Sequence, residues 1–236
     1  MARKTKEEAA ATRNRIVDAA ETVFHEKGVA HASLEEIAAA AGVTRGAIYW
    51  HFKDKAELFD AMMQRVMLPV EDLGERADAC DAGDPLLSLR NCAVGVLMRT
   101  AKDASVQRIF DIAYHKCEYV GDAAGVRERH IASQAECLKT IEAGFRECVK
   151  KGRVPASVNP RIAAIGAMSL VSGLIANWVL DPKSFSLRNH AETLVDTYFR
   201  GVAAENPSAM KMKTARTRKE RSSREPLPRS PGASRP

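Results

Sequence analysis

Polar and aromatic side chains able to contact nucleic-acid bases gather in one short stretch of this 236-residue chain, from Thr44 to His51. Arg45 carries a planar fork of N–H donors that matches the O6 and N7 acceptors of guanine. Thr44 and His51 can donate and accept hydrogen bonds, and Tyr49 adds an aromatic surface. In a helix these groups lie away from an apolar side that includes Ile48. The chemistry indicated is recognition of base edges in the major groove of DNA.

Residues 33–52 are expected to form two short helices that position these side chains. Ser33 and Glu36 form a capping box, in which each side chain satisfies a free backbone N–H at the start of the first helix. Gly42 can adopt the positive φ that the turn needs, and Thr44 caps the second helix. This is the pattern of a helix-turn-helix, whose second helix enters the major groove. The pattern alone leaves open an ordinary helical hairpin, because capped helices around a glycine are common in all-α proteins.

Helices on either side of this segment can bury its apolar face. Residues 7–27 repeat apolar side chains at helical spacing, with Arg13 and Arg15 near the outer side. Asp54 and Glu57 give a second capping pattern before a helix expected over residues 55–70. The apolar positions are Ile16, Ala19, Ala20, Val23 and Phe24 in the first of these helices and Leu58, Phe59, Met62, Met63 and Val66 in the second. Together these helices can bury one small core.

The rest of the chain shows no alternation typical of strands, and it divides into further helices at Gly, Pro and Asp residues. These helices are expected over residues 85–102, 106–119, 126–151, 161–180 and 187–204. The fold class predicted is all-α with about nine helices. The domains expected are a DNA-binding domain over residues 1–55, a helical ligand-binding and dimerisation domain over residues 56–204, and a tail over residues 205–236.

Several motifs resemble those of a known family. The run TRGAIYWHFKDKAELF at residues 44–59 and the opening ARKTKEEAAATRNRIVDAA are similar to the N-terminal domain of the TetR family, in particular its multidrug-efflux repressor (AcrR-like) subgroup. The likeness continues at Asp84–Leu86, at HKCEYV over residues 115–120 and at SGLIANWVL over residues 172–180. It spans about four-fifths of the chain.

This resemblance implies binding to double-stranded operator DNA. The DNA-binding residues that we infer are Ser33, Thr44, Arg45, Gly46, Tyr49, Trp50, His51 and Lys55, with Lys55 on the phosphate backbone. The resemblance also implies a homodimer formed through the last two helices. Two-fold symmetry then predicts a roughly palindromic operator with half-sites one helical turn, or a multiple of it, apart.

The large helical region suggests a cavity for a small-molecule inducer. Candidate ligand-binding residues are Met63, Met67, Cys92, Val96, Phe110, Asp111, Tyr114, Cys137, Ile141, Met168, Ser172, Ile175 and Trp178. Plain core packing is the alternative for each apolar position, since methionine stripes usually fill cores. Asp111 is the preferred charge for a cationic ligand, followed by Glu118.

The formal net charge of +6 comes entirely from the end of the chain. Residues 205–236 hold nine basic and three acidic side chains, whereas residues 1–55 hold nine and eight. Net charge therefore does not prove DNA binding. The tail is rich in Pro, Ser, Arg and Lys and is expected to be disordered. It either adds non-specific DNA affinity or has no role, and the second is favoured.

A membrane span is the main rival hypothesis for one segment. Residues 162–180 contain no charged side chain over 19 positions, which is long enough to cross a bilayer. The run contains Gly166, Ser169, Gly173 and Asn177, so a helix buried in a protein interface explains it better. The charged N-terminus lacks the apolar region of a signal peptide. We therefore expect a cytoplasmic protein without membrane contact.

Other chemistry has little support in the sequence. The five cysteines, at positions 80, 92, 117, 137 and 148, form no CxxC pair. His115 and Cys117 stand two apart and so point away from each other on a helix. We expect no metal, no cofactor and no enzymatic activity, because no nucleophile, base and orienting group occur together in the sequence pattern.

The function predicted is a transcriptional repressor of a multidrug efflux operon, released from its operator by a small hydrophobic or cationic ligand. The alternative is a TetR-type regulator of another pathway, which activates transcription or responds to a metabolite.

Overall fold

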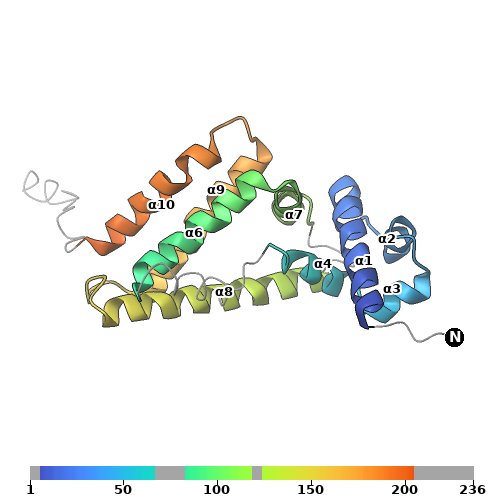
Figure 1. Ribbon diagram of the computed structural model, residues 1–236, viewed down its shortest axis with the longest axis horizontal. Helices are drawn as coiled ribbons and strands as arrows, with labels where there is room; N and C mark the ends of the chain where they lie inside the picture. The colour runs from blue at the N-terminus through green and yellow to red at the C-terminus, as the bar shows by residue number, and fades with distance from the viewer. Residues whose placement is uncertain (1–5, 67–82, 119–123, 205–236) are drawn as a thin grey trace, which may run out of the picture. The chain divides into compact units, whose positions relative to one another are not determined.

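The computed structural model describes residues 6–66, 83–118 and 124–204, and within these ranges it contains nine helices and no strand (Figure 1). The helices are α1 (Lys6–Lys27), α2 (Leu34–Ala40), α3 (Arg45–His51), α4 (Lys55–Met63), α6 (Pro85–Lys102), α7 (Ala104–His115), α8 (Ala124–Lys150), α9 (Pro160–Leu180) and α10 (Leu187–Ala203). The predicted all-α fold is confirmed.

The turn between α2 and α3 forms as the sequence indicates. The backbone N–H of Glu36 donates to Ser33 Oγ at 3.2 Å, and the N–H of Ser33 donates to Glu36 Oε2 at 3.0 Å. Gly42 adopts a φ of 63°, in the region that favours glycine. Thr44 Oγ1 accepts the N–H of Ala47 at 3.2 Å and caps α3. Local capping therefore fixes where both short helices begin.

The first four helices share one buried core. Ile16 and Phe24 of α1, Ile37 of α2, Ile48 of α3 and Leu58 of α4 are all fully buried. The predicted apolar stripe of α1 faces inward throughout. Burial of such side chains stabilises the fold by about 1.5–3 kcal/mol each.

Several helix boundaries differ from the sequence prediction, most of them by one or two residues, and the largest differences are the ends of α4 and α7, at Met63 and His115 instead of near residues 70 and 119. Helix α4 ends at Met63 rather than near residue 70, because the N–H groups of Arg65 and Val66 bond to carbonyls three residues back instead of four. Residues 67–70 of the predicted helix lie outside the described residues. Helix α7 begins two residues early because Asp103 accepts the N–H groups of Ser105 and Val106 at 2.9 and 3.3 Å.

The longer helices pack around one another. Helix α6 contacts α10, α8 and α9, and α8 contacts α9 (Figure 1). Glu142 of α8 is bonded to Arg161 of α9 at 3.0 Å and to Arg146 of its own helix at 2.5 Å. Helix α7 contacts α9 on one side and α1 on another, while α4 contacts both α1 and α8. The N-terminal helices are thus joined to the others through α4 and α7.

Helix α9 is the one helix in the described ranges that is long and apolar enough to cross a membrane. It packs Ala163 and Ala167 inside the protein, and Tyr198 of α10 donates a 2.6 Å hydrogen bond to the carbonyl of Ala163. Gly166 lies directly beneath this tyrosine, so a Cβ there would clash with its hydroxyl. Only 28% of the apolar window is buried, which leaves α9 with an exposed apolar face.

Candidate DNA-binding surface and ligand cavity

The outer face of α3 carries the side chains expected to contact bases. Arg45 and Trp50 are 72% and 73% exposed, Tyr49 is also exposed, and Ile48 faces the core. Gly46 is exposed, and no other group would approach a Cβ at that position within 4 Å. The short helix therefore exposes hydrogen-bond donors, an aromatic surface and, at Gly46, backbone that no side chain covers. An element that enters a DNA groove needs such a surface.

Glu35 of α2 holds two of these side chains in place, and the sequence argument missed this role. Its Oε1 is 3.0 Å from Arg45 Nε and accepts the Tyr49 hydroxyl at 3.4 Å. The Arg45 guanidinium lies over the Tyr49 ring, 5.7 Å from its centroid. These contacts restrict the rotamers of both side chains before any DNA arrives. The sequence signal was weak, because Glu35 looks like an ordinary acidic residue in the first turn of a helix.

The remaining predicted DNA contacts divide into two groups. His51 packs edge-on against Trp50, with ring centroids 4.5 Å apart, and Thr44 is exposed at the start of α3. Ser33 is engaged in its capping box, and the Lys55 ammonium donates to the carbonyls of Ala30 and Ala32 at 3.1 and 2.8 Å. Ser33 and Lys55 thus help to hold the loop before α2, and their contacts to DNA stay predictions.

Two arginines of α1 contact the turn between α2 and α3 and the end of α3. Arg15 Nη2 donates to the carbonyls of Ala41 and Gly42 at 2.7 and 3.3 Å, and the Arg13 guanidinium lies 4.8 Å from the centroid of the Phe52 ring. Phe52 is the C-cap of α3. The orientation of α3 therefore depends on α1.

A cavity of about 430 Å³ lies among α4, α6, α7, α8, α9 and α10, and its wall is mostly apolar. Ten of the predicted ligand-binding residues line it: Met63, Cys92, Val96, Phe110, Tyr114, Cys137, Ile141, Met168, Ser172 and Ile175. The size and the apolar wall are those of a site for a drug-sized molecule.

Two predicted ligand-binding residues lie elsewhere, and a third cannot be placed. Asp111 faces α1, where its Oδ2 is 3.4 Å from His25 Nε2, because it lies about 100° around α7 from Phe110. Trp178 donates from Nε1 to the carbonyl of Phe185 at 3.2 Å and does not line the cavity. Met67 is outside the described residues. The preference for Asp111 as the charge of the cavity was therefore wrong.

Glu118, the second choice of charge, lines a different and more polar hollow together with His25 and Lys116. The carboxylates that do line the main cavity are Asp60 of α4 and Glu136 of α8. The sequence prediction missed both, although Asp60 stands three residues before Met63 on one helix face.

Burial suppresses the charge of other titratable groups in the wall. It raises the pKa of Cys92 to about 11 and raises the pKa of Cys137, so both thiols are protonated at neutral pH. It also raises the pKa of Tyr114, whose hydroxyl hydrogen-bonds with Ser172, and lowers the pKa of His130. The cavity therefore presents neutral, polarisable groups, two carboxylates and the guanidinium of Arg129, which lies 3.7 Å from Asp54.

Two family models match the chain. Residues 16–62 match the model of bacterial regulatory proteins of the TetR family, and residues 84–203 match the C-terminal region of MAATS-type transcriptional repressors. The chain belongs to the TetR family. The first match contains α2 and α3, and the second contains helices from α6 to α10, which line most of the cavity.

Relatives of this TetR-family chain include transcriptional regulators, two of which repress efflux pumps. The transcriptional regulator TtgR of Pseudomonas putida is 39% identical over 197 residues, covering 84% of this chain and 94% of TtgR. NalD, the secondary repressor of the MexAB-OprM multidrug efflux pump in Pseudomonas aeruginosa, is 38% identical with a TM-score of 0.74, covering 85% of this chain and all of the NalD chain. SmeT of Stenotrophomonas maltophilia, in a complex with triclosan, is 29% identical with a TM-score of 0.72, covering 93% and 100%.

Membership of the TetR family makes this chain a DNA-binding transcriptional regulator and not an enzyme. Regulators of this family act as dimers and bind small molecules. Helix α3 is accordingly the second helix of its helix-turn-helix. In the described ranges, no three His, Cys, Asp or Glu side chains are grouped so that they could hold a metal ion.

Proposed function

We propose that this TetR-family regulator represses the operon of a multidrug efflux pump and leaves its operator when a small molecule occupies the main cavity. The observation that carries the proposal is the apolar cavity of about 430 Å³, whose wall includes α4 and α7, the helices that also contact α1. NalD is a repressor of such a pump, and SmeT forms a complex with triclosan, which supports both halves of the proposal.

The contact with DNA in this proposal is made by α3 in the major groove. Arg45 binds a guanine through its guanidinium fork, and Thr44, Tyr49 and His51 contact neighbouring bases or phosphates. Trp50 is exposed beside them and packs against sugar and phosphate groups. The N-terminal domain of residues 1–55 carries this surface and acts on operator DNA in the cytoplasm.

A homodimer formed through α9 and α10 places two copies of α3 on one operator. The exposed isoleucines of α9, Ile162 and Ile165, provide an apolar surface for the partner's helices. A two-fold axis between the copies requires a roughly palindromic operator, since each α3 meets the same sequence on opposite strands.

The ligand class follows from the cavity wall. Apolar side chains such as Phe110 and Ile175 favour a hydrophobic molecule. Asp60 and Glu136 can neutralise a positive charge on it, while the protonated thiols of Cys92 and Cys137 add no charge of their own. We infer a hydrophobic or cationic aromatic compound as inducer.

Release from DNA is a shift between two conformations of the dimer. The ligand displaces α4, which lines the cavity with Asp60 and Met63 and whose C-terminal turn is tied to α1 by Arg65, 2.6 Å from Asp18. The spacing of the two α3 helices then no longer matches the groove. Moving the population from almost all bound to almost all released needs about 5.5 kcal/mol of differential ligand affinity.

An electrophoretic shift assay tests the proposal. DNA from upstream of the chain's own gene and of adjacent transporter genes is titrated with the protein, with and without triclosan and a panel of cationic dyes. We expect a shifted band that at least one compound removes. If the protein binds DNA and no compound weakens that binding, the proposed release by a ligand is wrong. If the protein does not bind DNA beside a transporter operon, the proposed target operon is wrong.

A further inference from the structure

One arginine lines the ligand cavity where α8 passes the start of α4. Arg129 of α8 belongs to the cavity wall, and its side chain is 39% exposed. The acidic residues of the same wall are Asp60 and Glu136, and no other arginine or lysine of the described residues lines it. A negatively charged group of a ligand would therefore find its partner at Arg129.

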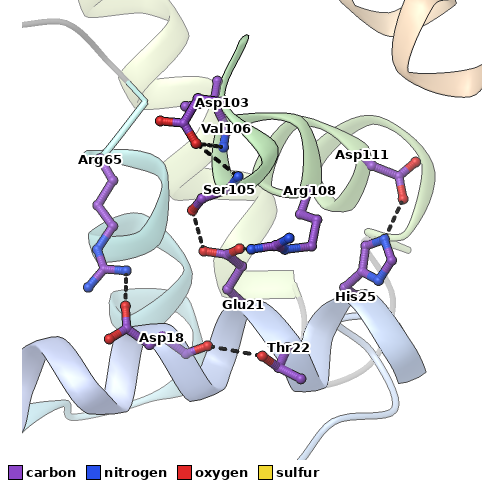
Figure 2. Close-up of polar contacts among 10 residues, drawn as sticks. All are labelled: Asp18, Glu21, Thr22, His25, Arg65, Asp103, Ser105, Val106, Arg108 and Asp111. Carbon is purple, nitrogen blue, oxygen red and sulfur yellow. Dashed lines mark hydrogen bonds and ion pairs between the residues drawn. The ribbon is translucent and has the colours of Figure 1, made fainter. Parts of the chain in front are cut away.

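Two other arginines near the cavity are engaged by α1 instead. Arg108 Nε donates to Glu21 Oε1 at 2.7 Å, and Ser105 Oγ donates to the other oxygen of this buried carboxylate at 2.6 Å (Figure 2). Arg65, just after α4, lies 2.6 Å from Asp18 (Figure 2). Neither arginine lines the cavity. Their charges are already neutralised by carboxylates of α1, so they do not compete with Arg129 for a ligand.

The guanidinium of Arg129 has unused hydrogen-bond donors. An arginine carries five N–H donors in a planar fork. Among the described residues Arg129 makes no hydrogen bond, and its ion pair is with Asp54, with 3.7 Å between Nη2 and Oδ2. This separation is too long for a hydrogen bond. Asp54 is also occupied as the cap of α4, where it accepts the N–H of Glu57 at 2.7 Å. A carboxylate in the cavity can therefore pair with Arg129 more closely than Asp54 does.

A second donor lies one turn further along the same face of α8. Ser133 follows Arg129 by four residues and also lines the cavity. Side chains four residues apart on a helix are neighbours, so the hydroxyl and the guanidinium can bind one group. Glu136 follows Arg129 by seven residues, which is two turns or about 10 Å along the helix axis. The cavity face of α8 thus changes from positive to negative along its length.

The two carboxylates of the wall have partners of their own. Gln64 Nε2 donates to Asp60 Oδ2 at 3.1 Å, and Lys139 Nζ lies 3.1 Å from Glu136 Oε2. The Glu136 side chain is 72% exposed, so water and salt screen its charge. Arg129 is more covered by protein, and its charge is screened less. Attraction of an anion by Arg129 therefore outweighs repulsion by Glu136.

We propose that Arg129, assisted by Ser133, binds the carboxylate of aromatic acids, so that the cavity accepts anions as well as neutral and cationic compounds. This inference rests on the proposed function, because it concerns the ligand of the same cavity. The carboxylate lies in the fork of Arg129 and accepts two parallel N–H hydrogen bonds. The aromatic rings lie against apolar wall residues such as Phe110 and Ile175.

Two probes of the same shape test this inference. Biphenyl-4-carboxylate carries the negative charge, and biphenyl-4-carboxamide replaces it by a neutral amide of nearly the same size. Calorimetry at neutral pH with the full-length protein gives both Kd values, and displacement of one probe by the other shows whether they share a site. The variants are Arg129→Gln and Ser133→Ala. The matched control is Arg127→Gln, which removes the same charge from an exposed position of α8 outside the cavity wall.

We expect the wild type and Arg127→Gln to bind the acid about tenfold more tightly than the amide, because hydrogen bonds between charged groups are the stronger ones. The ratio should fall to about twofold or less in Arg129→Gln, with little change in the Kd of the amide, and by a smaller amount in Ser133→Ala. A wild type that binds the acid no more tightly than the amide, or not at all, would overturn the inference, and this measurement needs no variant. A preference that survives in Arg129→Gln, or probes that do not displace each other, would overturn it as well.

DNA binding separates this inference from the proposed function. The electrophoretic shift assay is repeated with each probe at a saturating concentration. An acid that binds through Arg129 and leaves the DNA complex intact supports the inference and counts against release by a ligand. Probes that release DNA but bind with equal Kd support release by a ligand and overturn the inference.

Discussion

At the scale of single residues, the DNA-binding surface depends on a carboxylate that DNA itself would repel. Glu35 holds Arg45 and Tyr49 in one arrangement, with its Oε1 3.0 Å from Arg45 Nε. Both side chains are exposed, so the contact itself contributes little to stability. Its effect is to limit the rotamers that Arg45 samples, and in the complex that we propose Arg45 exchanges this partner for a base.

Replacing Arg45 by alanine should weaken operator binding by about 1–3 kcal/mol and relax specificity at one base pair. The reason is the loss of two parallel hydrogen bonds to guanine, which no other residue of α3 can supply. Anisotropy titrations on operators with single base changes measure this effect. Arg45→Lys is the control, since it keeps the charge but lacks the fork. If Arg45→Ala weakens binding to all sequences equally and Arg45→Lys keeps the affinity, Arg45 contacts phosphate instead.

Acid should weaken the contribution that the Glu36 carboxylate makes to stability. Hydrogen bonds from Lys27 and from the N–H and hydroxyl groups of Ser33 lower the pKa of Glu36 from 4.5 to about 2. A carboxylate whose pKa is depressed in the folded state stabilises the fold above its unfolded pKa and loses this effect as the pH falls. Urea unfolding should therefore show wild type more stable than Glu36→Gln at pH 6, with the difference shrinking between about pH 4.5 and pH 2. A difference that does not change with pH would exclude the carboxylate as its source.

At the scale of elements, local patterns in the sequence predict helix starts well. The capping box of α2 and the cap of α3 involve partners three residues apart, so they are visible in the sequence. Contacts between distant segments are not visible in this way. Glu21 and Arg108 stand 87 residues apart, and nothing in the periodicity of either helix names the other as its partner.

The same limit explains the errors at the cavity. Helical faces and family resemblance identified ten of its wall residues, because apolar residues at helical spacing face inward. They did not predict that Phe110 lines the cavity while Asp111, the next residue, faces α1. The rotation of α7 about its axis decides this, and it is set by packing against α1 and α9. Asp60 and Glu136 were missed because a charged residue on a helix is usually on its solvent side.

Asp103 connects two helices, because it is the C-cap of α6 and the N-cap of α7. Asp103→Ala removes the acceptor of the Ser105 and Val106 N–H groups and should destabilise the protein by about 1 kcal/mol. Urea unfolding measures the loss, and Asp103→Ser should recover most of it because serine also caps helices. Because α7 then begins less firmly beside Glu21, the alanine variant should also bind DNA more weakly.

At the scale of the whole molecule, recognition of DNA depends on two copies of α3 acting together. A helix of seven residues offers few base contacts, so one copy binds DNA weakly. Two copies joined rigidly gain affinity because binding of the second half-site becomes intramolecular. The exposed apolar face of α9 fits this need, since a helix with large apolar side chains in solvent is unusual unless another protein surface covers it.

Dimerisation can be separated from folding by changes on the exposed face of α9. Ile162 and Ile165 are 68% and 44% exposed on α9, so replacing each by glutamate should place charge in the proposed dimer interface without touching the core. Sedimentation should show a monomer, and operator affinity should fall by about 10²-fold or more because avidity is lost. Ile131→Glu is the matched control, as Ile131 is an exposed isoleucine of α8, outside the proposed interface, and this variant should remain a dimer with wild-type affinity. Circular dichroism should show unchanged helix content in all three. A dimer that survives both α9 substitutions would place the interface on another surface.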